Sequence, residues 1–214
     1  MQGIINLDQI KLTNKEISRL KKLIQISYQG AKDAVYEILG THCILQLDEI
    51  KFINSELFKS YLVDKIDYDK DISYITTQLF VGRFSGETVL FLDNNSASNL
   101  AKSFTLNDNN SDEINLRDIV LEISNILTSS MICKFTQELS TTISFTPPVL
   151  QQKESLQAIN EQLFNNFDQF MVISTKLIFK KQNIEGEILL ITKKSSLGWL
   201  RDSLYQYSQS GGIL

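Results

Sequence analysis

The stretch DIVLEISNILTSSMICKFTQEL, residues 118–139, sets the organisation of this 214-residue chain. Its apolar residues recur at three- and four-residue spacing, which is typical of a helix with one buried stripe. The stripe consists of Val120, Ile123, Leu127, Met131 and Phe135. Glu122 and Asn125 lie opposite this stripe, and residues three apart on a helix are neighbours, with Cβ atoms about 5–6 Å apart. We therefore expect a carboxylate and a carboxamide to project together from the outer face of the helix.

The rest of the chain repeats this unit at an offset of 100 positions. A shift of 100 residues places the helical segment 18–39 on 118–139, and it places Gly86-Glu87 on Gly186-Glu187, each followed by β-branched and aliphatic residues. The apolar residues of the first helical segment are Leu20, Leu23, Ile24, Ala31, Ala34, Val35 and Ile38. A period this long indicates duplication of a domain-sized unit rather than a solenoid.

Each half has the same expected order of elements: a long helix, an extended segment, a hairpin and a short closing helix. The extended segments are 42–52 and 141–150, the hairpins are 74–93 and 171–192, and the closing helices are 96–104 and 196–207. Hairpins favour antiparallel pairing, so we expect an α+β fold with an antiparallel or mixed sheet that carries the long helices on its face. A pseudo-two-fold pair of repeats, about 15–105 and 116–207, would share one core in a single domain spanning 1–214.

Composition excludes several classes of function. The net charge is −4 and no stretch concentrates Lys and Arg, which argues against nucleic acid as a ligand. His42 is the single histidine, which excludes multi-His metal sites. Cys43 and Cys133 lack CxxC spacing, so we expect free thiols in a cytoplasmic protein. The longest apolar runs have four or five residues, and no signal peptide is evident, so we expect no membrane insertion.

Asp118, Glu122, Asn125 and Pro148 together form the pattern Asp-x3-Glu-x2-Asn-x22-Pro. Combined with the repeat, this pattern resembles the signature of the CheC/CheX/FliY phosphatases of bacterial chemotaxis. The length and the tandem halves are most similar to CheC, whereas one intact motif is typical of CheX. In the resemblance, Glu122 and Asn125 carry the catalysis, while Asp118 and Pro148 support the motif.

The resemblance implies dephosphorylation of the phospho-aspartate of a CheY-type response regulator. Glu122 would contact the lysine of the receiver's active site, and Asn125 would orient the attacking water. The helper needs no metal of its own, because the receiver brings Mg²⁺ and phosphoryl transfer depends on positioning and electrostatics. CheD is a further partner implied by the resemblance, and a homodimer stays open.

The first half departs from the motif at every position. The corresponding residues are Ser18, Lys22, Gln25 and Asp48. Lys22 reverses the charge that would meet a receiver lysine, and Gln25 is longer than asparagine by one methylene. We therefore expect the first site to be inactive.

Several alternatives remain at this stage. Glu122 and Asn125 could belong to an ordinary solvated helix face, and Asp118 could serve as the N-cap of its helix. Pro148 has a structural role in either case. The whole chain could instead be a non-catalytic module that binds a receiver domain or CheD, or a structural protein associated with the flagellar switch.

Overall fold

The computed structural model describes residues 12–68, 72–105, 115–151 and 169–209. In chain order the elements are α1 (Asn14–Leu39), β1 (Ile44–Ile53), α2 (Ser55–Tyr68), β2 (Ile72–Gly82), β3 (Gly86–Asp93), α3 (Asn94–Thr105), α4 (Leu116–Glu138), β4 (Ile143–Phe145), β5 (Val149–Gln151), β6 (Phe170–Phe179), β7 (Ile184–Lys193) and α6 (Lys194–Gln209).

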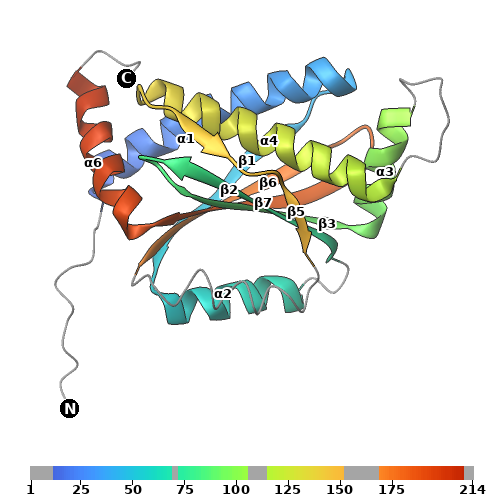
Figure 1. Ribbon diagram of the computed structural model, residues 1–214, viewed down its shortest axis with the longest axis horizontal. Coiled ribbons are helices and arrows are strands. Elements are labelled where there is room, and N and C mark those ends of the chain that lie inside the picture. Colours follow the sequence, from blue (N-terminus) through green and yellow to red (C-terminus); the bar gives the residue numbers. More distant parts are fainter. Residues whose placement is uncertain (1–11, 69–71, 106–114, 152–168, 210–214) are drawn as a thin grey trace.

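The strands form one sheet in the order β1-β6-β7-β3-β2-β4, with β5 also paired to β2, and every pairing is antiparallel. The helices α1 and α4 lie across one face, α2 lies on the opposite face, and α3 and α6 stand at the two ends (Figure 1). The predicted α+β class, with an antiparallel sheet and the long helices on its face, is therefore confirmed.

The centre of the sheet relates the two halves by a pseudo-two-fold axis. Val89 of β3 lies opposite Leu189 of β7, its counterpart at the offset of 100 residues. Gly86 pairs with Thr192 and Leu92 pairs with Gly186, as an axis between these two strands requires. On either side the halves interleave, because β1 pairs with β6 of the second half, while β4 and β5 pair with β2 of the first.

The main core lies between the sheet and the helices α1 and α4. All five residues of the predicted α4 stripe are at most 3% exposed. Phe84 stacks on Phe135 at 4.9 Å between ring centroids and packs against Trp199. The prediction fails for Ile38, which is 44% exposed, because the last buried position of α1 belongs to Leu39 and the helix ends at Gly40 in the left-handed conformation (φ 62°).

Two further elements differ from the sequence-based expectation. The helix α2 was not anticipated; the Asn54 side chain accepts from the Leu57 N–H at 2.9 Å at its start. Phe58 and Leu62 are buried in a second core on the face opposite α1 and α4. The extended segment expected at 141–150 is divided into β4 and β5, because consecutive prolines interrupt the pairing.

The remaining single-residue expectations have mixed outcomes. Cys43 and Cys133 are both free thiols, as predicted, the first buried and the second exposed. Burial raises the pKa of Cys43 to about 11. His42 is exposed and stacks on Tyr36 with ring centroids 4.4 Å apart. Among the described helices, α4 alone has the length and apolarity of a membrane span, but 61% of its most apolar window is buried, as in a core helix.

Gly86 begins β3 and pairs with Thr192 of β7. A Cβ atom at this position would collide with the Ile191 carbonyl oxygen and would lie 2.8 Å from Cζ of Phe80. Neither neighbour is a flexible chain end, so the strands would have to separate. We expect Gly86→Ala to lower the free energy of unfolding by about 3 kcal/mol, measured by urea denaturation. An unchanged denaturation midpoint would contradict the β3–β7 register.

The second residue of the repeated Gly-Glu pair lies on the sheet face opposite α4. Glu87 is 6% exposed, and the Thr77 hydroxyl, which also accepts from Nε2 of Gln151 at 3.0 Å, donates to its carboxylate. Burial raises the pKa of Glu87 to about 7, against weaker opposing effects of the Thr77 hydrogen bond and Lys193.

This raised pKa makes stability depend on pH. Between about pH 4.5 and pH 7 the folded chain holds a proton on Glu87 that the unfolded chain has lost, so stability falls as the pH rises through this window. The free energy of unfolding lost across this window amounts to about 3 kcal/mol. We expect Glu87→Gln to remove this loss, giving a variant more stable than wild type at pH 8 and similar at pH 4.5. Urea denaturation of wild type and variant at several pH values measures this difference in the free energy of unfolding. Glu185→Gln, at an exposed position, is the control.

Candidate functional site

The helix α4 presents Asp118, Glu122 and Asn125 along its first three turns. Asn115 caps the helix, since its side chain accepts from the Arg117 N–H at 3.1 Å. The alternative that Asp118 is the N-cap is therefore wrong. Asp118 is exposed in the first turn, where a carboxylate stabilises the positive end of the helix dipole.

Glu122 is exposed, as predicted, but Asn125 is half-buried. Its Oδ1 accepts a hydrogen bond from Nε2 of Gln78 at 2.8 Å. The expectation that both side chains project freely is thus wrong for Asn125. It follows Ser124, which faces the sheet and is buried, so Asn125 lies on the flank of α4 that meets β2.

Gln78 lies on β2 with 1% of its surface exposed, and its Nε2 also donates to the Thr146 carbonyl oxygen at 2.9 Å. Thr146 follows β4 and is attached to β2 by two further hydrogen bonds: its N–H donates to the Leu79 carbonyl at 3.0 Å, and its Oγ1 accepts from the Leu79 N–H at 3.2 Å. We call Glu122, Asn125, Gln78 and Thr146 the amide site.

Pro148 is half-buried in the interruption between β4 and β5, two residues after Thr146. Proline offers no N–H to the ladder, so the chain leaves β2 here and returns at Val149. The structure thus places Pro148 beside the amide site as a backbone element, which is the structural role considered from the sequence.

A row of hydroxyls joins α4 to the sheet behind the amide site. Thr76 Oγ1 donates to Ser124 Oγ at 2.6 Å, and the hydroxyls of Thr88 and Thr128 are 2.9 Å apart. We call these four residues the hydroxyl seam. All four are at most 3% exposed, so each hydroxyl depends on a partner within the protein, and Thr88 Oγ1 also donates to the Gln78 carbonyl oxygen at 3.4 Å. The seam fixes which way α4 is rotated over β2 and β3, and hence where Asn125 lies.

The first half has a different arrangement at the equivalent place. Ser18, Lys22 and Gln25 are exposed on α1. Asp48 lies at an irregularity of β1 and forms an ion pair with Lys176 at 3.1 Å.

The sheet pairing also identifies the counterpart of Gln78 beneath α1, a residue of β6 that comes from the second half. Gln78 lies opposite Thr88 and Thr175 lies opposite Ile188, so Thr175 holds the equivalent position. Its hydroxyl bonds instead to that of Tyr28 at 2.6 Å. Gln25 lines an open groove of about 570 Å³ between α1 and β1.

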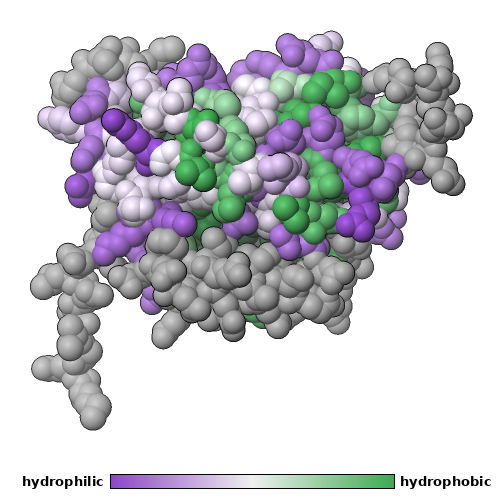
Figure 2. Space-filling view, in the orientation of Figure 1, coloured by the Kyte–Doolittle hydropathy of each residue, from purple (hydrophilic) through white to green (hydrophobic). Residues whose placement is uncertain are grey.

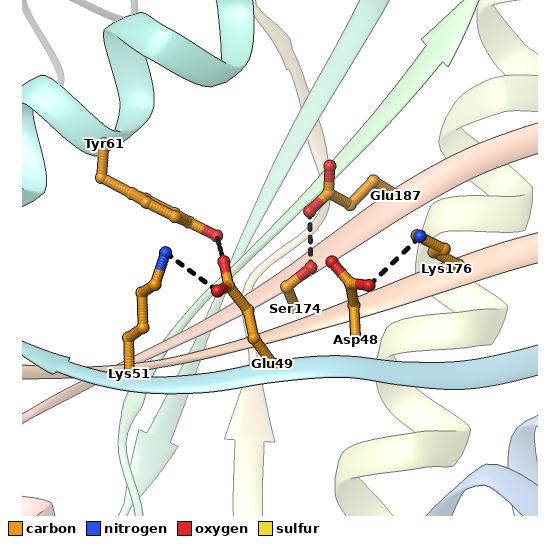
Figure 3. A network of polar contacts seen from close by, with 7 residues as sticks. All are labelled: Asp48, Glu49, Lys51, Tyr61, Ser174, Lys176 and Glu187. Atoms are coloured by element: carbon orange, nitrogen blue, oxygen red, sulfur yellow. Dashed lines mark hydrogen bonds and ion pairs between the residues drawn. The ribbon is translucent and has the colours of Figure 1, made fainter.

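A second polar cavity, of about 560 Å³, lies on the opposite face between α2 and the sheet. Figure 3 shows polar contacts at this cavity: Lys51 pairs with Glu49 at 2.8 Å, the Tyr61 hydroxyl donates to Glu49 at 2.9 Å, and Ser174 donates to Glu187. Burial and Glu49 both raise the pKa of Tyr61. Within the described residues no group of three or more His, Cys, Asp or Glu could hold a metal ion.

This antiparallel sheet with two long helices across one face is similar in fold to solved structures of FliY, FliM and CheX. No family model matches the sequence, and no curated protein matches it. The likeness is to solved structures.

FliY of Thermotoga maritima superposes with a TM-score of 0.66 at 14% identity, covering 92% of this chain and 100% of that one. FliM from an H. pylori FliM–SpeE complex gives 0.59 at 9% identity, covering 92% and 98%. CheX of Desulfovibrio desulfuricans gives 0.51 at 11% identity, covering 80% and 99%. At such identities the likeness shows the fold alone.

The hydroxyl seam allows a direct test of how α4 is held. Thr88→Val alone should lower the free energy of unfolding by about 1–3 kcal/mol, because it leaves the buried Thr128 hydroxyl without its partner. Thr128→Val should cost less, since the Thr88 hydroxyl keeps a longer hydrogen bond to the Gln78 carbonyl oxygen at 3.4 Å. The double variant should cost no more than Thr88→Val, since both hydroxyls are then gone. Urea denaturation of the four proteins measures the coupling. Additive losses would contradict the pairing.

Proposed function

We propose that the chain dephosphorylates the phospho-aspartate of a CheY-type receiver domain, with Asn125 orienting the attacking water and Glu122 contacting the receiver's lysine. The observation that carries this proposal is the amide site. It contains an exposed carboxylate one turn from a half-buried carboxamide whose oxygen is held by a buried side chain. A solvated helix face would not fix an asparagine in this way, which favours a role for Asn125 beyond solubility.

The chemistry fits the groups that are present. An aspartyl phosphate is an acyl phosphate with a good leaving group, so acceleration requires mainly a positioned water. An amide oxygen has two lone pairs and an amide nitrogen two hydrogens. After Gln78 has donated to it, Asn125 still offers one lone pair and its Nδ2 donors to a water or a phosphoryl oxygen. Mg²⁺ would come from the receiver.

The surface around the amide site suits a protein partner. Figure 2 shows apolar and polar residues interspersed over the part of the molecule that α4, β4 and β5 form in Figure 1. Val149 of β5 is exposed, as are Thr146 and Pro147 just before it. Interfaces that form and dissociate have about the same polar and apolar mixture as other protein surface, so this face is compatible with one. CheD and a second copy of the chain are further candidate partners, and we place the protein in the cytoplasm.

A second candidate function is a non-catalytic module of the flagellar switch. FliY and FliM superpose with higher TM-scores than CheX and over more of the chain. Two H. pylori FliM structures are complexes with other proteins, one with SpeE and one with FliG. In this case the amide site would serve recognition of a receiver or a switch protein without turnover.

The decay of a phosphorylated CheY-type receiver, followed with and without this protein in the presence of Mg²⁺, tests the proposal. We expect faster decay with wild type and a loss of about a hundredfold in that acceleration for Asn125→Ala, because one group that positions the reaction is removed. Gln25→Ala, at the equivalent position of the first half, should leave the rate unchanged.

Either of two results would contradict the proposed phosphatase activity. One is decay at the spontaneous rate with wild type, and the other is full activity of Asn125→Ala. If wild type left the decay at the spontaneous rate but still bound the receiver in a pull-down, the non-catalytic module would be the better explanation.

A further inference from the structure

We propose that Gln78, from the half of the chain that lacks the motif, is a positioning residue for Asn125 and fixes which end of its amide faces an incoming partner. This inference rests on the proposed function and deepens it. Neither the motif nor its spacing includes Gln78, which lies 47 positions before Asn125.

The orientation of both amides follows from one backbone carbonyl. The Thr146 carbonyl oxygen can only accept, so Gln78 must present its NH₂ group there. The same nitrogen, with its second hydrogen, reaches Asn125 at 2.8 Å, so Asn125 must present its oxygen to Gln78. The Nδ2 group of Asn125 is then directed away from Gln78.

This arrangement restricts a side chain that would otherwise rotate. Asn125 is half-buried, and without Gln78 its amide could turn about its last torsion and exchange oxygen for nitrogen. With Gln78 in place, a partner always meets the Nδ2 donors and the one free lone pair of Oδ1. Reactions that depend on a positioned water lose much of their rate when the positioning group is displaced by an ångström.

Gln78 is a poor choice for stability alone. Its Oε1 is buried and has no hydrogen-bond partner among the described residues. A buried polar atom without a partner costs free energy, and an apolar side chain of similar length would avoid that cost. Local choices that oppose stability are expected at functional sites.

The site at α1 provides an internal comparison. Thr175 holds the position of Gln78, and its hydroxyl is bonded to Tyr28. Gln25, the counterpart of Asn125, is exposed. The long amide on the strand is therefore present beside the intact motif and absent beside the altered one.

The test compares Gln78→Met, Gln78→Glu and the matched control Thr175→Val. Gln78→Met keeps the length of the side chain and removes both hydrogen bonds. We expect kcat for dephosphorylation of the receiver to fall about tenfold with KM changed less than twofold, because positioning is lost and docking is kept. Its Tm should not fall. The control should keep wild-type kcat.

Gln78→Glu replaces the donor with an acceptor. The new carboxylate repels both the Thr146 carbonyl and Oδ1 of Asn125, so the Asn125 amide should invert. We expect kcat to fall at least as far as in Gln78→Met. If wild type is active, an equal kcat for wild type and both variants would overturn the proposal.

A measurement that does not depend on turnover separates this inference from the proposed function. The Asn125 side-chain amide gives a pair of ¹⁵N–¹H resonances, assigned by their loss in Asn125→Ala. We expect them to shift in Gln78→Met and Gln78→Glu and to stay unchanged in Thr175→Val. If wild type proves inactive but these shifts occur, the proposed phosphatase activity is rejected and the positioning role of Gln78 is retained. Unshifted resonances would overturn the positioning role whatever the activity.

Discussion

The pairing of β3 with β7 about Val89 and Leu189 is the constraint on which the rest of the structure depends. It places the hairpins of the two halves side by side in one sheet. The extended segment of each half then pairs with the hairpin of the other: β1 with β6, and β4 and β5 with β2. The core under α1 and α4 is continuous across the junction. The same exchange brings β2 of the first half beneath α4 of the second, so that Gln78 meets Asn125.

Much of this arrangement follows from local patterns in the sequence. The α4 stripe predicted a helix over 118–139, and the helix spans Leu116–Glu138 with all five stripe residues buried. The offset of 100 residues aligns Val89 with Leu189, and the structure adds that these two residues lie opposite one another in the central pair. Such features are predictable because periodicity and turn residues act over a few positions, where helix and hairpin geometry is decided.

The features that the sequence did not predict depend on contacts between residues far apart in the chain. No pattern within α4 indicates that Asn125 is held, because its partner comes from another strand of the other half. A weak signal exists in β2, where Thr76 and Gln78 put polar groups on the same face as the buried Phe80. The helix α2 had a clearer signal in Asn54 followed by Phe58 and Leu62, four residues apart on one helix face.

Since the amide site draws Asn125 from one repeat and Gln78 from the other, the two repeats have ceased to be interchangeable. Cutting the chain at its central connection would separate a motif from its support, and neither fragment would carry a complete centre. Reassembly of co-expressed fragments would be needed to restore it. A substitution in β2 of the first repeat can therefore change how the second repeat presents its asparagine, although the two positions are 47 residues apart.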